Sequence, residues 1–196
     1  MRFYDFAKAV VHPLTGALFA VTATGYENVP ATGPLIVAAN HRSYIDPPLI
    51  GSWFPRTVHW MAKDELFRIP ILGTLIRWSC AFPVARGEAD VGAIKRALRL
   101  LKEGEVVGIF PEGTRNLSGD VESKAGAVLI ASRARCPVVP IGVSRTAIAM
   151  KRLRSSHVEM RIGAPITFQG SSRRATKAEL DAWTVELSKA IDDLTD

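Results

Sequence analysis

Residues 37–47 have the sequence Val-Ala-Ala-Asn-His-Arg-Ser-Tyr-Ile-Asp-Pro, in which a strand-like run gives way to a polar turn and then to a helix start. The apolar residues Leu35 to Ala39 are typical of a buried strand. Asp46, followed by proline, is typical of a helix N-cap with proline in the first turn. This arrangement predicts that His41 stands at the end of a strand, with a carboxylate five residues later that folds back towards it.

His41 and Asp46 have two interpretations at this stage. A histidine is a useful base near neutral pH because its ordinary pKa is about 6.5, and a carboxylate that holds its second ring nitrogen stabilises the imidazolium. Alternatively, Asp46 is only a helix cap, or forms a capping box with Ser43, and His41 is an ordinary loop residue. Residues 37–47 alone do not distinguish between these two interpretations.

A second strand-like run, Val106 to Phe110, is followed at once by Pro-Glu-Gly-Thr-Arg-Asn at residues 111–116. Two strands that each end in a polar turn are expected to finish at the same edge of a sheet, where α/β proteins place their sites. Arg115 offers a planar fork of donors suited to a phosphate monoester. Alternatively, an ion pair between Glu112 and Arg115 only stiffens the turn.

Taken together, Asn40-His41-x-Ser43-x-x-Asp46 and Phe110-Pro-Glu-Gly-Thr-Arg115 resemble the signature motifs of the glycerolipid acyltransferases, among them the lysophosphatidate acyltransferases. The resemblance extends from about Gly25 to about Gly142, in the order and spacing of the family. It implies an α/β fold: a single-domain mixed sheet flanked by helices, with an N-terminal amphipathic helical segment.

The resemblance also implies roles for individual residues. His41 is expected to act as the general base and Asp46 to orient it. The substrate-binding residues are expected to be Glu112, Gly113, Thr114 and Arg115 of the second motif, together with the basic residues Lys63, Arg86 and Lys124. Arg115 is expected to hold the phosphate of the acceptor, with Lys63, Arg86 and Lys124 in support, whereas Glu112 is expected to accept hydrogen bonds from the acceptor or from backbone amides. Neither a metal nor a cofactor is expected, because an acyl thioester is already activated.

The reaction that the resemblance implies is that of a 1-acylglycerol-3-phosphate O-acyltransferase, with lysophosphatidate as acceptor, phosphatidic acid as product, and acyl-CoA or acyl-carrier protein as co-substrate. Glycerol 3-phosphate or another lysolipid is an alternative acceptor. From a different class, the alternative is a basic nucleic-acid- or membrane-binding module, since the net charge of +6 favours anionic partners. The chain has no recognisable nucleic-acid-binding motif, so no nucleic-acid partner is expected.

Apolar residues recur at helical spacing near the N-terminus: Phe3, Phe6, Ala7, Val10, Val11 and Leu14. Residues 1–22 are therefore expected to form one or two amphipathic helices, ahead of an acyltransferase domain over residues 23–196. No run of about 18 uncharged apolar residues occurs, so a transmembrane helix is not expected. The stripe either packs on the core or docks on an anionic membrane surface, and the implied lipid substrates favour docking. This predicts a cytoplasmic protein, peripheral on the inner face of the cell membrane.

Composition and local patterns add expectations about the core, the cysteines and two later helices. With 196 residues, 47% of them hydrophobic, the chain is long enough for one domain with a full core. Its two cysteines, Cys80 and Cys136, have neither metal-site nor disulfide spacing and are expected to be buried thiols in a reducing cytosol. Residues 91–102 have the pattern of an amphipathic helix with a solvated basic face, and Thr176 with Glu179 predicts a capping box at a final helix.

Overall fold

The structure, a computed structural model, describes residues 3–85, 90–111, 125–149, 157–168 and 175–195. The elements in chain order, with η marking 3-10 helices, are α1 (Phe3–Phe19), β1 (Thr22–Thr24), η1 (Tyr26–Asn28), β2 (Leu35–Ala39), α2 (Asp46–Trp53), β3 (Val58–Lys63), η2 (Asp64–Arg68), α3 (Pro70–Trp78), β4 (Phe82–Val84), α4 (Val91–Lys102), β5 (Val106–Ile109), α5 (Ala125–Ala134), β6 (Val138–Ser144), α6 (Thr146–Ala149), β7 (Glu159–Ile162) and α7 (Lys177–Asp192).

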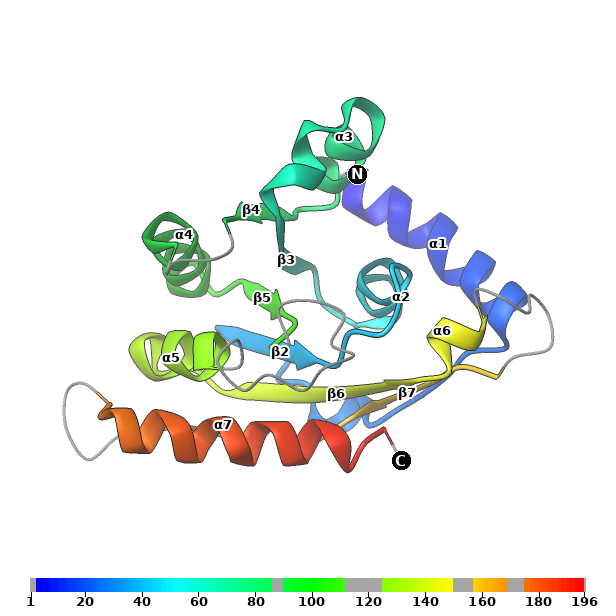
Figure 1. The fold of residues 1–196 in the computed structure, drawn as a ribbon. Coiled ribbons are helices and arrows are strands. Elements are labelled where there is room, and N and C mark those ends of the chain that lie inside the picture. The colour runs from blue at the N-terminus through cyan, green and yellow to red at the C-terminus, as the bar shows by residue number, and fades with distance from the viewer. Residues whose placement is uncertain (1–2, 86–89, 112–124, 150–156, 169–174, 196) are drawn as a thin grey trace.

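The strands form one seven-stranded sheet in the order β1-β7-β6-β2-β5-β3-β4, with helices on both of its faces (Figure 1). From β6 to β4 every neighbouring pair is parallel, whereas β7 is antiparallel to β6 and parallel to β1. The predicted single-domain mixed α/β sheet is therefore confirmed. Because five adjacent strands run the same way, their carboxyl ends share one edge, at which ligands bind in α/β sheets.

Strand β2 lies between β5 and β6, and all five of its residues are fully buried. Its side chains alternate between the two faces of the sheet. Leu35, Val37 and Ala39 pack into the core under α1 and α2, while Ile36 and Ala38 pack into the core shared with α4, α5 and α7. A strand covered on both faces needs an apolar residue at every position, which explains the continuous apolar run.

Two later helices have the N-terminal signals that helices require. Asp90 caps α4 by accepting a hydrogen bond from the Ala93 backbone N–H at 2.9 Å. At α7 the predicted capping box is present, because the Thr176 hydroxyl accepts from the backbone N–H of Glu179 and the Glu179 carboxylate accepts from the backbone N–H of Thr176. The basic face of α4 is exposed as expected, with Lys95, Arg96, Arg99 and Lys102 in solvent.

The N-terminal segment forms one helix rather than two, and its inward face differs from the predicted stripe. The buried side chains of α1 are Tyr4, Thr15 and Phe19. The Tyr4 hydroxyl donates to the Gly51 carbonyl oxygen and accepts from the Val58 N–H, both at 3.1 Å, and burial raises the pKa of Tyr4 to about 12. Polar contacts of this kind attach α1 to α2 and β3, so α1 is part of the folded unit.

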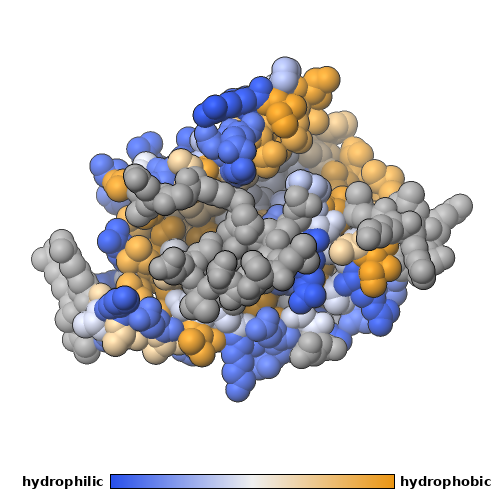
Figure 2. Space-filling model, in the orientation of Figure 1, coloured by the Kyte–Doolittle hydropathy of each residue, from blue (hydrophilic) through white to orange (hydrophobic). Residues whose placement is uncertain are grey.

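The opposite face of α1 is apolar and open to solvent. Phe3, Phe6, Val10 and Leu14 are 37–57% exposed. Helix α3 adds a second row of exposed apolar residues. The two helices meet at Phe3 and Trp78, whose ring centroids lie 4.8 Å apart. Figure 2 shows apolar side chains gathered over α3 and along α1. The α1–α3 apolar surface is defined here as Phe3, Phe6, Val10, Leu14, Ile71, Leu72, Leu75 and Trp78.

Among the described helices, none combines the length and the apolar content that crossing a bilayer requires.

Candidate active site

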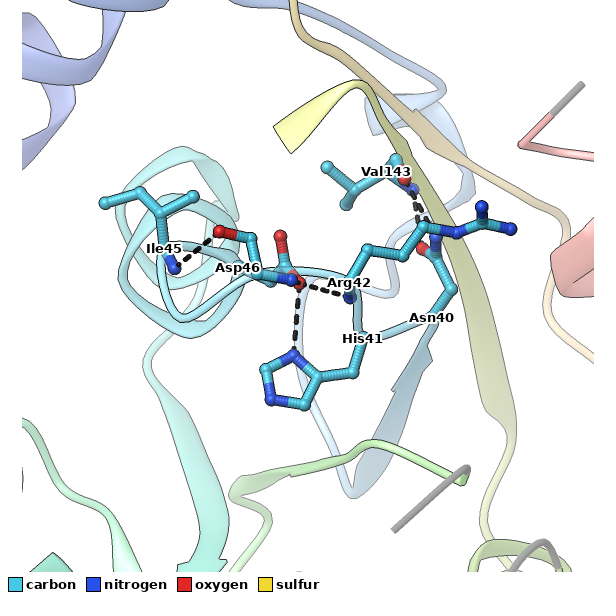
Figure 3. Close-up of polar contacts among 7 residues, drawn as sticks. Asn40, His41, Arg42, Ile45, Asp46 and Val143 are labelled. Carbon is cyan, nitrogen blue, oxygen red and sulfur yellow. Dashed lines mark hydrogen bonds and ion pairs between the residues drawn. The ribbon is translucent and has the colours of Figure 1, made fainter. Parts of the chain in front are cut away.

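His41 stands in the turn between β2 and α2, and its Nδ1 lies 3.0 Å from Oδ2 of Asp46 (Figure 3). The predicted contact between the two side chains is therefore confirmed. Asp46 is 1% exposed and His41 is 16% exposed at its side chain. An ionised carboxylate only accepts hydrogen bonds, so Nδ1 must donate and the lone pair of the neutral ring is on Nε2. The nitrogen that can accept a proton is thus the one that points away from Asp46.

Asp46 is not the N-cap that the sequence predicted. Helix α2 begins at Asp46 itself, its N-cap is Ile45, and there is no side-chain cap hydrogen bond. The carboxylate turns back instead, and Oδ2 also accepts from the backbone N–H groups of Arg42 at 2.7 Å and Ser43 at 2.6 Å. Three donors in the preceding turn surround Oδ2, so this oxygen does not also cap the helix. The Ser43 hydroxyl accepts from Ile45 N–H at 3.4 Å, so Ser43 and Asp46 form no capping box.

The second carboxylate oxygen of Asp46, Oδ1, is buried and has no hydrogen-bond partner among the described residues. A buried carboxylate whose hydrogen bonds are all on one oxygen retains uncompensated negative charge. Among the described residues, the group paired with Asp46 that can become positive is the imidazole of His41. The arrangement therefore favours positive charge on that ring at the moment when Nε2 takes up a proton.

Asn40 fixes the start of the turn. Its side chain is buried, and its amide donates to the carbonyl oxygen of Val143 at 2.8 Å and accepts from the Val143 N–H at 2.7 Å (Figure 3). The backbone pairing of β2 with β6 ends at Ala39 and Ile141, so the Asn40 side chain takes over where the ladder stops. Sequence reasoning gave Asn40 no role. The available signal was its position: an amide that both donates and accepts, directly after a buried strand.

The second motif meets the first at Phe110. Strand β5 pairs with β2 in parallel, with Ala38 opposite Ile109. Phe110 follows β5, and its ring stacks on the His41 imidazole with centroids 4.3 Å apart and planes 26° apart. The expectation that the two strands end at one edge is confirmed. The predicted substrate-binding residues Glu112, Gly113, Thr114 and Arg115 lie outside the described residues.

Of the three remaining basic candidates, Lys63 is described. It is the last residue of β3, at the carboxyl edge that also carries His41, and its Nζ lies 2.5 Å from Oε2 of Glu65. Arg86 and Lys124 lie outside the described residues. Within the ranges that the structure describes, no three His, Cys, Asp or Glu side chains come together as a metal site would need. The roles of all three basic residues in phosphate binding stay predictions.

The comparisons with known proteins agree with this geometry. Residues 20–144, more than half of the chain and including the His41 turn, match the family model described as Acyltransferase. The chain is 33% identical over 192 residues to the 1-acyl-sn-glycerol-3-phosphate acyltransferase of Bacillus subtilis, covering 97% of this chain and 96% of that protein. It is 35% identical over 133 residues to the enzyme of the same name from Streptococcus pneumoniae, covering 67% of this chain and 49% of that protein.

A solved structure extends the likeness to the fold. The crystal structure of the 1-acyl-sn-glycerophosphate (LPA) acyltransferase PlsC from Thermotoga maritima superposes with a TM-score of 0.68 at 27% identity, covering 98% of this chain and 78% of that chain. The family match, the relative that is similar over nearly its full length, and the shared fold all agree with the two sequence motifs. The chain therefore belongs to the glycerolipid acyltransferase family.

Proposed function

We propose that the protein transfers a fatty acyl group from an acyl thioester to the free hydroxyl of 1-acyl-sn-glycerol 3-phosphate, forming phosphatidic acid. The observation that carries the proposal is the His41–Asp46 pair: Nδ1 is held by a buried carboxylate, while Nε2 has no hydrogen-bond partner among the described residues. The relatives named as 1-acyl-sn-glycerol-3-phosphate acyltransferases support the choice of acceptor. The donor is acyl-CoA or acyl-carrier protein.

The geometry supports direct transfer with His41 as the general base. Nε2 removes the proton from the acceptor hydroxyl as its oxygen attacks the thioester carbonyl carbon. The tetrahedral intermediate then collapses, the carbon–sulfur bond breaks, and the imidazolium returns the proton to the departing thiolate. Asp46 keeps the ring in the required tautomer and stabilises its charged form, as a carboxylate does in a histidine-based triad. The thioester is already activated, so these residues need only position the reactants and move a proton.

Arg115 is proposed to bind the phosphate of the acceptor, with Lys63, Arg86 and Lys124 in support. The parallel pairing of β2 with β5 favours this role, because residues that follow β5 start from the edge that carries His41. A guanidinium binds phosphate through two parallel hydrogen bonds, which fixes both the distance and the orientation of the acceptor. Holding the phosphate in this way sets the position of the free hydroxyl relative to Nε2.

The test is a turnover assay with purified protein, a labelled acyl donor of each type, and a panel of lysophosphatidate, glycerol 3-phosphate and other lysolipids. Lysophosphatidate is expected to be the preferred acceptor. The His41→Ala variant is expected to lose about 10²–10⁴ in kcat, because general-base catalysis contributes that much. The matched control is His59→Ala, since His59 also has a carboxylate partner, Glu105 at 3.6 Å, but lies near the amino end of β3.

Equal turnover by the wild type and the His41→Ala variant would rule out the proposed mechanism. A preference for glycerol 3-phosphate or another lysolipid would keep the mechanism and change the acceptor. No transfer to any acceptor, with retention on a nucleic-acid column, would favour the nucleic-acid-binding alternative.

We further propose that the protein acts at the inner face of the cell membrane, with the α1–α3 apolar surface resting on the bilayer. Helices α1 and α3 come from distant parts of the sequence and lie beside each other in Figure 1, and Figure 2 shows apolar side chains gathered over both. Exposed Arg77 on α3 supplies positive charge next to this surface for anionic headgroups. Apolar area and adjacent positive charge are the two terms that drive interfacial binding.

Flotation with vesicles tests this docking. Wild-type protein is expected to bind vesicles that contain anionic phospholipid more strongly than purely zwitterionic ones. Phe6→Asp combined with Leu75→Asp is expected to weaken binding at least about tenfold, because charged groups resist transfer into the interface. Val185→Asp is the matched control: Val185 is 65% exposed on α7, outside the α1–α3 apolar surface. Equal binding by both variants and wild type would contradict the proposal.

A further inference from the structure

The imidazole of His41 is the end of a stack of three rings. Phe110 lies against His41, with centroids 4.3 Å apart, and Trp60 lies against Phe110, with centroids 4.6 Å and planes 11° apart. The three residues come from the turn after β2, the residue after β5, and the interior of β3. Phe110 is thus in contact with the proposed base on one side and with a core residue on the other.

Trp60 is a buried support for this stack. It is 5% exposed, and it is the register partner of Gly108 in the neighbouring strand. A Cβ at Gly108 would come within 2.4 Å of Trp60 Cε3 and 2.7 Å of Cδ2, so the indole occupies the space that any other side chain at that position would need. Because Gly108 has no side chain, the indole of Trp60 can pack directly against the backbone of β5.

Packing, rather than a hydrogen bond, holds Trp60 in place. Its Nε1 is buried and has no hydrogen-bond partner among the described residues. An unpaired buried donor is unfavourable, and Phe at this position would avoid it. The contribution of Trp60 is therefore the shape of its indole and the flat face that packs against Phe110.

We propose that Phe110, supported by Trp60, is a positioning residue that fixes the ring plane of His41 for acyl transfer. The inference rests on the proposed function, in which His41 is the base. The hydrogen bond to Asp46 fixes the direction of one ring atom, Nδ1, but it leaves the plane of the imidazole free to tilt about that contact. A flat ring against the imidazole face removes this freedom, and the two contacts together determine where Nε2 points.

The stack also suits the charge that forms during the reaction. When Nε2 takes the proton of the acceptor hydroxyl, the imidazole becomes a cation lying on the electron-rich face of Phe110. Such a cation is attracted by the ring quadrupole. The attraction is present while His41 holds the proton and is gone once the thiolate has received it. Phe110 therefore acts mainly on the transition state, and its loss is expected to lower kcat rather than to raise KM.

A rival role for Phe110 is contact with the acyl chain of the donor. The ring is partly buried and apolar, which suits either role. The two roles predict different kinetics. A residue that only binds the chain raises the KM for the donor when it is removed, and its effect depends on chain length. A residue that positions the base lowers kcat with every donor.

The experiment compares Phe110→Leu with Phe110→Tyr. In Phe110→Leu, kcat is expected to fall at least about tenfold while both KM values stay within about twofold, because a displaced base slows chemistry without weakening uniform binding. Phe110→Tyr keeps the ring face and is expected to restore kcat to within about threefold of wild type. Phe110→Met keeps the apolar volume without a flat face, so it should resemble Phe110→Leu, and it replaces that variant if Phe110→Leu folds poorly.

The control is the same substitution in another aromatic pair. Phe168 is 3% exposed and packs on Trp183 with centroids 5.6 Å apart in the core on the other face of the sheet. Phe168→Leu is expected to lower the melting temperature and to leave kcat unchanged. If both Leu variants lower kcat in proportion to their loss of stability, Phe110 has only a packing role and the inference is wrong.

A second readout needs no turnover. A histidine Nδ1–H held by a carboxylate gives a low-field proton resonance in the NMR spectrum, which His41→Ala identifies by its disappearance. That resonance is expected to broaden or vanish in Phe110→Leu and to return in Phe110→Tyr. An unchanged resonance in Phe110→Leu would overturn the inference even if no acceptor is turned over. Absence of acyl transfer with the expected NMR pattern would overturn the proposed function alone.

Discussion

Asp46 and Asp90 both stand at the start of a helix, yet their carboxylates interact with different parts of the chain. Asp90 precedes α4 and shares its oxygens between the helix and the loop before it: Oδ1 accepts from Ala93 N–H at 2.9 Å and Oδ2 accepts from Ala85 N–H at 2.8 Å. Asp46 is the first residue of α2, and the donors to its Oδ2 among the described residues all belong to the turn that precedes the helix. One carboxylate stabilises a helix end, whereas the other organises the His41 turn.

An aspartate at the start of a helix is thus not in itself a cap. At α2 the first turn needs no carboxylate cap because Pro47 and Pro48 have no N–H to satisfy. The oxygen is therefore free to serve the turn before the helix. At α4 the first turn consists of Val91, Gly92 and Ala93, whose N–H groups do require an acceptor. Proline in the first helical turn is thus what distinguishes the two sites in the sequence.

The largest effect is expected from exchanging carboxylate for amide at both sites. Asp46→Asn is expected to lower kcat by about 10³, since an amide can donate to Nδ1 and so place the ring proton on Nε2, the wrong nitrogen for a base. Asp90→Asn is expected to leave kcat unchanged. Steady-state kinetics on both variants checks this. Equal activities would show that Asp46, like Asp90, has only a structural role.

The next largest effect is expected at the strand side of the His41 turn. Asn40→Ala leaves the buried N–H and C=O of Val143 without partners, which is expected to lower the free energy of unfolding by about 1–3 kcal/mol and the melting temperature by several degrees. Its kcat is also expected to fall, because the turn loses its anchor. Chemical denaturation and turnover are the measurements.

Asn28→Ala is the matched control, because the Asn28 amide makes one hydrogen bond, to the Ile162 carbonyl oxygen at 2.9 Å, away from the His41 turn. A smaller loss of stability and normal kcat are expected. If Asn40→Ala kept full kcat, the turn would be held by Asp46 alone.

A smaller effect is expected from removing the cap of α4. Asp90→Ala is expected to lower the free energy of unfolding by about 1 kcal/mol, the usual contribution of an N-cap side chain, with kcat unaffected. Thermal unfolding monitored by circular dichroism measures the difference. A loss of activity at normal stability would mean that α4 influences the site, and the contrast between the two aspartates would fail.

The smallest effect is the pH dependence of that cap. Hydrogen bonds from the Ala85 and Ala93 backbone N–H groups lower the pKa of Asp90. A carboxyl group whose pKa is lower in the folded state contributes stability above its unfolded pKa of about 3.9, and this contribution is lost as the pH falls through the folded pKa. The melting temperature of wild type is therefore expected to exceed that of Asp90→Asn by a degree or so at pH 7 and to converge with it in acid. A constant difference across this range would exclude the charge as its source.

Features that depend on neighbours along the chain could be predicted from the amino-acid sequence. The run of Leu35 to Ala39 predicted a buried strand because each position needs an apolar side chain, and Thr176 with Glu179 predicted a capping box because both partners lie within one turn. His41 and Asp46 are five residues apart in one turn, so their contact was also predictable. The predicted substrate-binding residues of the second motif, Arg115 among them, lie outside the described residues, so their roles stay predictions.

Features that join distant segments depend on how the whole chain packs, and they could not be predicted from local patterns. Both faces of α1 are apolar, so periodicity could not tell that Tyr4 turns inward and Phe6 outward; the choice follows from the hydrogen bonds that Tyr4 makes to Gly51 and Val58. Asn40 reaches Val143 across 103 residues, and the support of His41 comes from Phe110 and Trp60, on two other strands. Such contacts depend on the order of strands in the sheet, and strand order is set by the packing of the whole core rather than by any local pattern of residues.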